Sequence, residues 1–507
     1  MLFNSIDFVV FFPVVVALYF AIPYRWRWTF LLASSYYFYA CWKLEYLALI
    51  MASTLIDYAA GRAMGRRETR AERRPFLLMS LCSNLGILFF FKYANFFGES
   101  VEEAFRPFNI FVDMPAFDIL LPVGISFYTF QTLAYSIDVY RGRQQAERHL
   151  GIFAVYVCFW PQLVAGPIER SQSLLPQFRE RHPFRWSLAA DGLKLMAWGF
   201  FQKVVIADRA ALYVGTVYAN PEAYVGWTTY LAIVIFAVQI YCDFAGYTNI
   251  ARGAARVMGY ELMKNFRQPL YAIDIADFWR RWHISLTTWF RDYLYFPMGG
   301  SRVPKWRWGF NTFFVLAVCG LWHGASWTFV MWGVVNGVYL AFAALTATFR
   351  NGLWDRAEAA FARFKPRTET VQQMGVALPP TLWQRLQTWI IPTPRRFIRT
   401  LVGFHLIILS LIFFRATTMT DAWTMLSHLF SLTSTEVVVG INNYEFLLLL
   451  VSIAVLLLVD LIELRENIRS FLKRRPAWVR FPIYAALVLA ILMLGEYGAQ
   501  EFIYFQF

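Results

Sequence analysis

Long apolar runs alternate with short basic segments along the chain, and this pattern restricts the fold more than any other feature. Several apolar runs are shorter than the roughly 20 residues that span a bilayer as a helix. Because backbone polar groups in lipid must be bonded internally, we expect an all-α polytopic membrane protein whose shorter helices re-enter and are covered by neighbours. The runs lie near residues 8–23, 28–42, 46–60, 76–92, 119–138, 150–168, 188–206, 228–246, 309–348, 401–415, 445–463 and 482–498.

Composition indicates the same class of protein. Hydrophobic residues make up 58% of the 507 residues and charged residues 16%, whereas a soluble domain carries about 25% charged residues. The 50 Phe, 27 Tyr and 20 Trp exclude a disordered or fibrous chain. The net charge is +14, but the basic residues lie between the apolar runs. That placement favours a membrane protein over one that binds nucleic acid.

The basic segments predict a topology for one membrane domain over residues 1–507. Residues 62–74 hold six Arg against two Glu, residues 249–308 hold ten Lys or Arg against four acids, and residues 465–480 hold six against one. By the positive-inside rule we expect these segments in the cytoplasm and both termini outside. This alternation requires that the run at 150–168 re-enters without crossing.

Two further segments have expected roles outside the bilayer core. Residues 350–399 are basic and interrupted by proline, and we expect cytoplasmic interfacial helices there, including an amphipathic one over 354–364. Residues 416–443 are polar, and we expect an external loop in which Asp421 caps a short helix. This loop is the expected contact for an extracytoplasmic partner.

His323 lies in the stretch Gly320-Leu-Trp-His-Gly-Ala-Ser-Trp327, between two apolar runs. An ionisable group at membrane depth is costly and by default marks a functional site. The flanking glycines permit close approach of backbone or substrate, and Trp322 and Trp327 are candidate pocket walls. The alternative is a buried structural histidine that bonds a neighbouring carbonyl.

His283 lies in a second aromatic stretch, Asp277-Phe-Trp-Arg-Arg-Trp-His283 and onward. If the stretch is one helix, Trp279 and His283 share a face with Leu286 and Phe290, and Asp277 pairs with Arg281. The alternative is an interfacial helix whose Trp and Arg side chains lie in the headgroup layer.

Other polar residues in or near the apolar runs are weaker candidates. Asp243 lies in an apolar helix and is expected to be either bonded or functional. We expect His405 to be a structural histidine, and His149, His182 and His428 to be solvated. No motif for a metal or a nucleotide is visible in the sequence, so we expect no metal site and no bound cofactor.

The two histidine stretches resemble the motifs of the membrane-bound O-acyltransferase (MBOAT) family. The matching segments are Phe278-Trp-Arg-Arg-Trp-His-Ile-Ser-Leu-Thr-Thr-Trp-Phe-Arg-Asp-Tyr-Leu-Tyr295 and Gly320-Leu-Trp-His-Gly-Ala-Ser-Trp-Thr-Phe-Val-Met-Trp332. The resemblance extends over almost the whole chain and is weakest at 350–400 and 416–443. It is greatest to the bacterial branch that O-acetylates polysaccharides such as alginate. Shorter matches are Phe90-Phe-Lys-Tyr-Ala-Asn95, Leu121-Pro-Val-Gly-Ile-Ser-Phe-Tyr128, Ile137-Asp-Val-Tyr-Arg-Gly142, Ala165-Gly-Pro167 and Phe502-Ile-Tyr-Phe-Gln-Phe507.

This resemblance implies an MBOAT-like helical bundle with a central funnel or tunnel that leads to the family's essential histidine, His323. The second family histidine falls on His283. It also implies a bacterial inner-membrane enzyme with an acyl donor in the cytoplasm and an acceptor outside. The implied donor is acetyl-CoA or another acyl thioester, and the implied partners are a periplasmic SGNH-type acetyltransferase and the exopolysaccharide machinery. A relative that D-alanylates teichoic acid uses a carrier-protein thioester. The resemblance therefore does not decide whether the acyl donor is acetyl-CoA or a carrier-protein thioester.

The chemistry of acyl transfer suits these residues. A hydroxyl is a poor nucleophile until a base removes its proton, and a neutral imidazole can do so at cellular pH. His323 is our candidate general base, with an acyl-histidine intermediate as the alternative. His283 is expected to orient the donor or to handle a second proton. Arg280 and Arg281 are candidates for the phosphates of coenzyme A or for lipid headgroups.

Two other classes of protein remain compatible with the sequence. A sugar or lipid transporter or flippase would also contain buried polar residues and broken helices, although its usual internal repeats are not visible. A structural export scaffold would tolerate substitution of both histidines. Consumption of labelled acetyl-CoA by membranes distinguishes the enzyme from a transporter.

Overall fold

The structure is a computed structural model that describes residues 1–110, 115, 117, 121–164, 166–363, 394–431, 438, 441–498 and 502–503. Every regular element in these ranges is helical, so the predicted all-α class is confirmed. In these ranges, seven helices are long and apolar enough to cross a membrane. They are Glu45–Met64, Arg70–Phe108, Trp227–Val257, Trp327–Leu345, Arg395–Arg415, Asn443–Glu463 and Ala477–Leu494.

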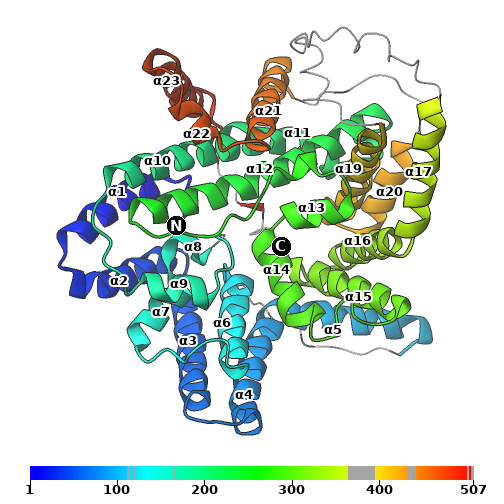
Figure 1. The fold of residues 1–507 in the computed structure, drawn as a ribbon. Coiled ribbons are helices and arrows are strands. Elements are labelled where there is room, and N and C mark those ends of the chain that lie inside the picture. The colour runs from blue at the N-terminus through cyan, green and yellow to red at the C-terminus, as the bar shows by residue number, and fades with distance from the viewer. Residues whose placement is uncertain are drawn as a thin grey trace.

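The N-terminal half surrounds one long buried helix, α12. In the most apolar 18-residue stretch of α12, 83% of the residues are buried inside the protein. Figure 1 shows α10 lying along α12. A membrane helix that is buried on all sides acts as the centre of a bundle rather than as a lipid-facing helix. The helices of this half are α1 (Ile6–Ala21), α2 (Arg27–Ala40), α3 (Glu45–Met64), α4 (Arg70–Leu88), α5 (Ala94–Phe105), α6 (Ile125–Tyr140), α7 (Leu150–Cys158), α8 (Trp160–Leu163), α9 (Ser171–Gln177), α10 (Trp186–Phe200), α11 (Asp208–Ala219) and α12 (Trp227–Val257).

The C-terminal half carries both candidate histidines. His283 lies between α13 and α14, and His323 is the last residue of α15. The expected apolar run at 309–348 divides into two helices, α15 and α16, at the residues after His323. The helices of this half are α13 (Ile275–Arg281), α14 (Ile284–Phe290), α15 (Lys305–His323), α16 (Trp327–Leu345), α17 (Ala347–Arg363), α19 (Pro394–Arg415), α20 (Met419–Leu429), α21 (Asn443–Glu463), α22 (Ile468–Lys473) and α23 (Ala477–Leu494).

Two pairs of consecutive α-helices are joined by a π-helical turn. The π-helix η2 (Phe89–Tyr93) joins α4 to α5, and η4 (Phe201–Ala207) joins α10 to α11. A third, η7 (Arg291–Tyr295), continues α14. Such π-turns are frequent at functional sites, and η7 follows the helix that His283 caps.

The short run at 150–168 forms α7 and α8, which have nine and four residues and are buried. At 1.5 Å per residue, nine residues cover about 14 Å, well under the ~30 Å hydrocarbon core. Neither helix is long enough to cross, as the predicted topology requires.

The outer segments agree in part with expectation. Helix α17 covers residues 347–363, which includes most of the predicted amphipathic helix, whereas 364–393 lie outside the described residues. In the segment at 416–443, Asp421 and Thr418 form a capping box at the start of α20, as the sequence indicated. The expectation that His182 is solvated is wrong: it is buried, and its Nε2 lies 2.8 Å from Gln177 O.

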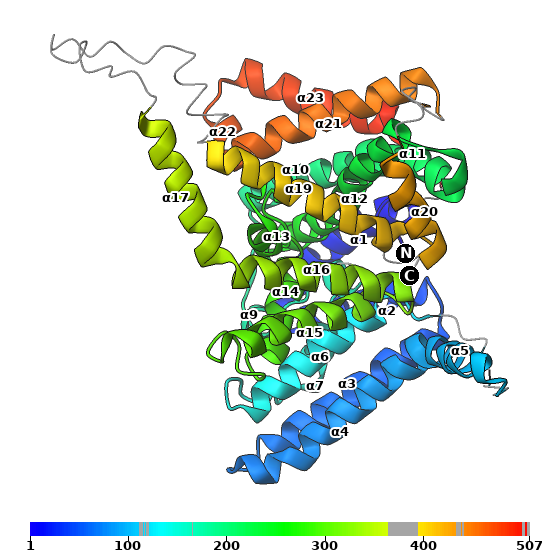
Figure 2. The same ribbon diagram turned by 90° about the vertical axis from the view of Figure 1, so that its right-hand side faces the viewer.

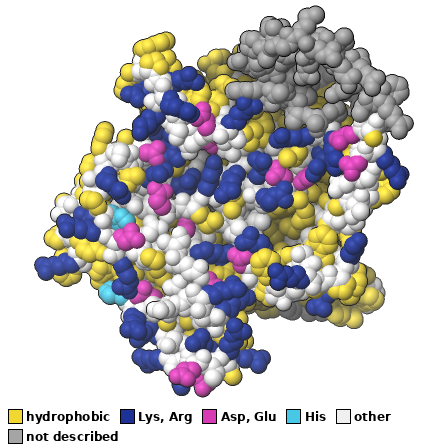
Figure 3. All heavy atoms as spheres, in the orientation of Figure 1, with side chains coloured by type: hydrophobic (Ala, Val, Ile, Leu, Met, Phe, Trp, Pro, Cys, Tyr) yellow, Lys and Arg dark blue, Asp and Glu magenta, His cyan; other side chains and the backbone are white. Residues whose placement is uncertain are grey.

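Two of the predicted cytoplasmic loops lie on the same side of the molecule. The α3–α4 turn and α22 are on one side of the molecule, at the left of Figure 2, whereas α5 and α20 are on the other. We call the first side the basic face, because Lys and Arg side chains are spread over it in Figure 3. The other side is called the opposite face.

We expect the basic face to be cytoplasmic. A cysteine at position 70, at the start of α4, should react with a membrane-impermeant maleimide only after permeabilisation, because basic loops are retained inside. A cysteine at position 418, before α20, is the matched control and should react in intact cells. Labelling of position 70 from outside would contradict the predicted order of cytoplasmic and external segments.

Candidate active site

His323 is enclosed by aromatic rings at the end of α15. Its side chain is buried, with 3% of the residue exposed. The rings of Trp322, Trp332 and Phe414 lie 5.0, 5.1 and 5.2 Å from the imidazole, each nearly perpendicular to it. Such packing shields the ring from bulk water and fixes its orientation. Trp332 and Phe414 come from α16 and α19, so three helices build this enclosure.

The end of α15 is held by side chains from the π-turn η2. Lys92 Nζ donates to the carbonyls of Trp322 and His323 at 2.8 and 3.0 Å. Tyr93 Oη donates to the carbonyl of Leu321 at 3.0 Å. The last carbonyls of a helix have no partner within the helix, and a cation there also suits the helix dipole. Sequence reasoning singled out the stretch containing Lys92 only as a family match, not as part of the site.

Close approach of α15 and α16 depends on two facing glycines. A Cβ added to Gly333 would lie 2.3 Å from Leu316 O and 3.0 Å from Gly320 Cα. These are backbone atoms, so a methyl group here would force the two helices apart. The glycines thereby set the distance between His323 on α15 and Trp332 on α16.

Gly333→Ala is therefore expected to reduce acyl transfer at least about tenfold, because a displacement of ~1 Å at the reacting groups has a large effect on rate. Gly309→Ala on α15 is the matched control, since its added Cβ would meet nothing closer than 3.5 Å. Both variants would be compared by turnover and by thermal unfolding in detergent. Equal activity of the two would contradict the assigned role of the glycine contact.

His283 does not lie within a continuous helix, which corrects the sequence-based expectation. Its backbone is left-handed, with φ of 42°, and it forms the N-cap of α14, where its Nδ1 accepts from Leu286 N at 3.2 Å. Asn265 supports the break by accepting from Ile284 N at 2.9 Å and from Ser285 N at 3.1 Å. A non-glycine residue in this conformation is strained and occurs mostly where function requires it.

The hydrogen bond at Nδ1 also determines the protonation of His283. Since Nδ1 accepts a hydrogen bond, the neutral ring carries its hydrogen on Nε2. The residue is buried, with 1% exposed, and its ring lies 4.6 Å from that of Phe244 and 6.2 Å from that of Trp322. Trp322 thus contacts both histidines, so the structure brings together two residues that are forty positions apart in sequence.

A large cavity opens beside this centre toward the basic face. It has a volume of about 940 Å³ and includes Trp279 and Cys319, one helical turn before His323. His323 itself is not among the lining residues. Three arginines that sequence reasoning missed line it: Arg291, Arg350 and Arg399.

One acidic residue, Asp274, also lines this cavity. Burial acts to raise its pKa, but the hydrogen bond from Asp277 N and the ion pair with Arg399 outweigh burial, so the pKa of Asp274 lies below its usual value. The carboxylate is therefore ionised and neutralises Arg399. Arg291 pairs with Asp292, whereas Arg350 forms no ion pair within the described part of the chain.

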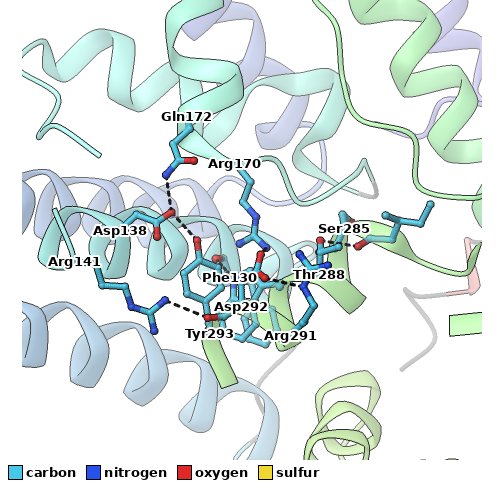
Figure 4. Close-up of polar contacts among 12 residues, drawn as sticks. Phe130, Asp138, Arg141, Arg170, Gln172, Ser285, Thr288, Arg291, Asp292 and Tyr293 are labelled. Carbon is cyan, nitrogen blue, oxygen red and sulfur yellow. Dashed lines mark hydrogen bonds and ion pairs between the residues drawn. The ribbon is translucent and has the colours of Figure 1, made fainter. Parts of the chain in front are cut away.

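A polar cluster supports the end of α14 on the basic face (Figure 4). Tyr293 Oη donates to Asp138 at 2.7 Å, and Asp292 forms ion pairs with Arg170 at 3.2 Å and with Arg291 at 2.9 Å. These contacts connect α6 and the segment before α9 to the π-turn η7. They fix the segment that presents Arg291 to the large cavity.

Two smaller cavities lie away from the large one. A cavity of about 50 Å³ is lined by Lys92, Trp322 and His323 together with residues 121–127. It shares Lys92 and Leu121 with a cavity of about 380 Å³ at the end of α19, which Arg415 also lines. His323 therefore adjoins space on the side away from the basic face.

Four of the predicted site residues lie elsewhere. Trp327 is 53% exposed and packs on Phe96 at 5.5 Å, and it lines none of the cavities described above. Arg280 and Arg281 pair with Asp277 at 3.3 and 2.8 Å, the latter as predicted, and do not line the large cavity. The fourth residue is Asp243.

Asp243 belongs to a buried ion cluster. Its Oδ1 lies 2.6 Å from Lys203 Nζ, which also pairs with Asp208 at 2.8 Å. Its Oδ2 accepts from Ile503 N at 2.8 Å. Asp243 is thus bonded, and it connects the C-terminal segment to α12 instead of reaching the cavities. His405 is likewise a structural histidine, with Nε2 3.1 Å from Tyr230 Oη.

Comparison with known proteins identifies the family of this chain. Residues 149–359 match the family model described as MBOAT, membrane-bound O-acyltransferase family. The chain is 39% identical over 343 residues to a probable alginate O-acetylase of Azotobacter vinelandii, covering 67% of this chain and 68% of that protein. It is 36% identical over 436 residues to the probable alginate O-acetylase of Pseudomonas aeruginosa, covering 85% and 75%. A peptidoglycan O-acetyltransferase of Helicobacter pylori is 33% identical over 340 residues, covering 61% and 63%.

Proposed function

We propose, since this chain belongs to the membrane-bound O-acyltransferase family, that it transfers an acetyl group from a cytoplasmic thioester for O-acetylation of an extracytoplasmic polysaccharide such as alginate. The protein is a multi-pass membrane O-acyltransferase. We also propose that it lies in the bacterial inner membrane. The observation that carries it is the position of His323, which is enclosed by aromatic rings between cavities toward opposite faces.

The proposed reaction assigns His323 as general base. Its imidazole removes the proton of the acceptor hydroxyl, the oxygen attacks the thioester carbonyl carbon, and a tetrahedral intermediate forms. The carbon–sulfur bond then breaks, and the thiol leaves with the proton returned by the imidazolium. His283 donates from Nε2 to orient the donor or to stabilise the developing charge. The dry aromatic enclosure protects the thioester from hydrolysis.

We propose the large cavity as the donor site. Its position toward the basic face, its volume of about 940 Å³ and its arginines suit a polyanionic thioester such as acetyl-CoA. Access of the acyl group to His323 then requires movement at Trp279 or Cys319, which line the inner end. The extracytoplasmic partner, a periplasmic SGNH-type acetyltransferase within the exopolysaccharide machinery, would receive or deliver the acyl group at the opposite face.

The donor site is tested by Arg350→Gln. Loss of one charged hydrogen bond to phosphate costs about 1.5–3 kcal/mol, so we expect KM for acetyl-CoA to rise at least about tenfold while kcat stays within about twofold. Arg302→Gln, an exposed residue of the same face, is the matched control and should leave KM unchanged. If only the pair Arg280→Ala with Arg281→Ala raised KM, the donor would bind outside the large cavity.

A further inference from the structure

The space of about 50 Å³ beside His323 is bounded on one side by the N-terminus of α6. Residues 121–127 line it together with Lys92, Trp322 and His323. Since a cavity needs about 10–15 Å³ to hold one water, this space holds a group of a few heavy atoms, such as an acetyl group. A group placed there lies beside the imidazole that is our candidate base.

One backbone N–H at this end of α6 has no partner. The N–H groups of the first, third and fourth residues of the helix donate to the carbonyls of Pro122 and Gly124. In the described part of the chain, no acceptor bonds the N–H of the second residue, Ser126. A side chain at the N-cap position commonly takes this donor, but the N-cap is Gly124, which has no side chain.

The backbone requires a glycine at this N-cap. Gly124 is left-handed, with φ of 76°, and a Cβ added to it would lie 2.9 Å from Leu163 O of α8. The end of α6 is therefore uncapped because α8 packs against it. The N-terminus of a helix carries a partial positive charge and free N–H groups, which together favour negative charge on a ligand.

A second unpaired donor lines the same space. Trp322 is 4% exposed, and its Nε1 is buried without an acceptor among the residues that the structure describes. Its ring lies 5.0 Å from that of His323 and 6.2 Å from that of His283. A buried donor without an acceptor is costly, and here the missing acceptor would be an atom of a ligand beside His323.

We propose that the N–H of Ser126 and the Nε1–H of Trp322 form an oxyanion hole for the carbonyl oxygen of the thioester. The proposal rests on the acyl transfer proposed above and adds the groups that stabilise its tetrahedral intermediate. The two donors come from α6 and α15, and both face the space in which the acetyl group lies. His283 is then left to orient the donor.

The two donors act on charge and lose no proton. When the acceptor oxygen bonds to the carbonyl carbon, the π electron pair of the carbonyl moves onto its oxygen, and both N–H groups donate to that oxyanion. The pair returns to the carbon–oxygen bond when the carbon–sulfur bond breaks. The electrons of the broken bond leave with sulfur, which takes the proton from the imidazolium of His323.

The first test replaces Trp322 by β-(3-benzothienyl)alanine, which keeps the shape of the indole but carries sulfur in place of the N–H. Removal of one oxyanion donor lowers kcat by about 10²–10³. We therefore expect acetyl-CoA consumption by membranes that contain the full chain to fall at least about hundredfold in kcat, with KM within about twofold. The same replacement at Trp160 is the matched control, because its Nε1 is also buried without an acceptor in the described ranges but it lines none of the described cavities. It should leave kcat within about twofold.

The second test removes the backbone donor. Proline has no N–H and is tolerated in the first turn of a helix, so Ser126→Pro should lower kcat by the same order. Ser187→Pro is the matched control, because Ser187 is an exposed serine at the second position of α10, another helix without a side-chain cap. It should leave kcat unchanged.

Binding of ethyl-CoA, a thioether without a carbonyl oxygen, distinguishes this role from a structural one. Its affinity should be the same for the unaltered protein and for both altered sites. Unchanged kcat after either substitution would overturn the proposal, and so would a loss of ethyl-CoA affinity that matched the loss of kcat. Failure of the reaction itself is separate, because it would appear as no acetyl-CoA consumption by the unaltered protein or as full activity of His323→Ala.

Discussion

His323→Ala is expected to lower acyl transfer by roughly two to four orders of magnitude, the usual contribution of a general base, while the protein still inserts and accumulates. The reason is geometric: the imidazole is held in one orientation by three aromatic rings at 5.0–5.2 Å, and alanine leaves no base at that position. Lys92 donates to the backbone carbonyl of His323, so truncation of the side chain to alanine leaves this hydrogen bond intact.

The measurement is cleavage of radiolabelled acetyl-CoA by purified protein, together with the acetyl content of polymer in cells. His405→Ala is the matched control, because His405 also lies in a membrane helix but bonds Tyr230 and the carbonyl of Leu401. It should retain activity. Normal polymer acetylation in cells with His323→Ala would reject His323 as the base and would favour the scaffold or transporter hypotheses.

Lys203→Met is expected to have the largest effect on stability. The Lys203 side chain is 2% exposed and pairs with Asp243 at 2.6 Å and Asp208 at 2.8 Å. Removing the Lys203 ammonium leaves the buried carboxylates of Asp208 and Asp243 without the counter-charge that they share, and breaking a buried ion pair in this way costs about 3–5 kcal/mol. We expect little folded protein to accumulate and a large fall in Tm in detergent.

A triple variant separates charge from packing. Lys203→Met combined with Asp208→Asn and Asp243→Asn removes all three charges and keeps an oxygen to accept from Ile503 N. Replacing a whole buried ion cluster by neutral groups is often tolerated, so this variant should regain most of the lost stability. If Lys203→Met were as stable as the unaltered protein, or if the triple variant were no better, the cluster would not be the element that holds the C-terminal segment.

The membrane class could be predicted from the sequence, and the two histidines could be selected as candidates, because both signals are local. Apolar runs and basic loops are properties of contiguous residues, and helices in lipid satisfy their own backbone. The capping box of Asp421 is also local, since it joins residues three positions apart. His323 was recognisable because the glycines and tryptophans that flank it are its sequence neighbours.

The environment of these residues was decided only by the tertiary structure. Lys92 contacts the His323 carbonyl across 231 positions, and Ile503 bonds Asp243 across 260. The left-handed break at His283 depends on Asn265, and a repeating aromatic pattern predicts a continuous helix there instead. Hydrophobic periodicity reports which face of a helix is buried, but not which helix covers it. The identity of the facing side chain depends on packing among many helices, and so the contacts of Lys92 and the structural role of Asp243 could be identified only after the bundle had been assembled.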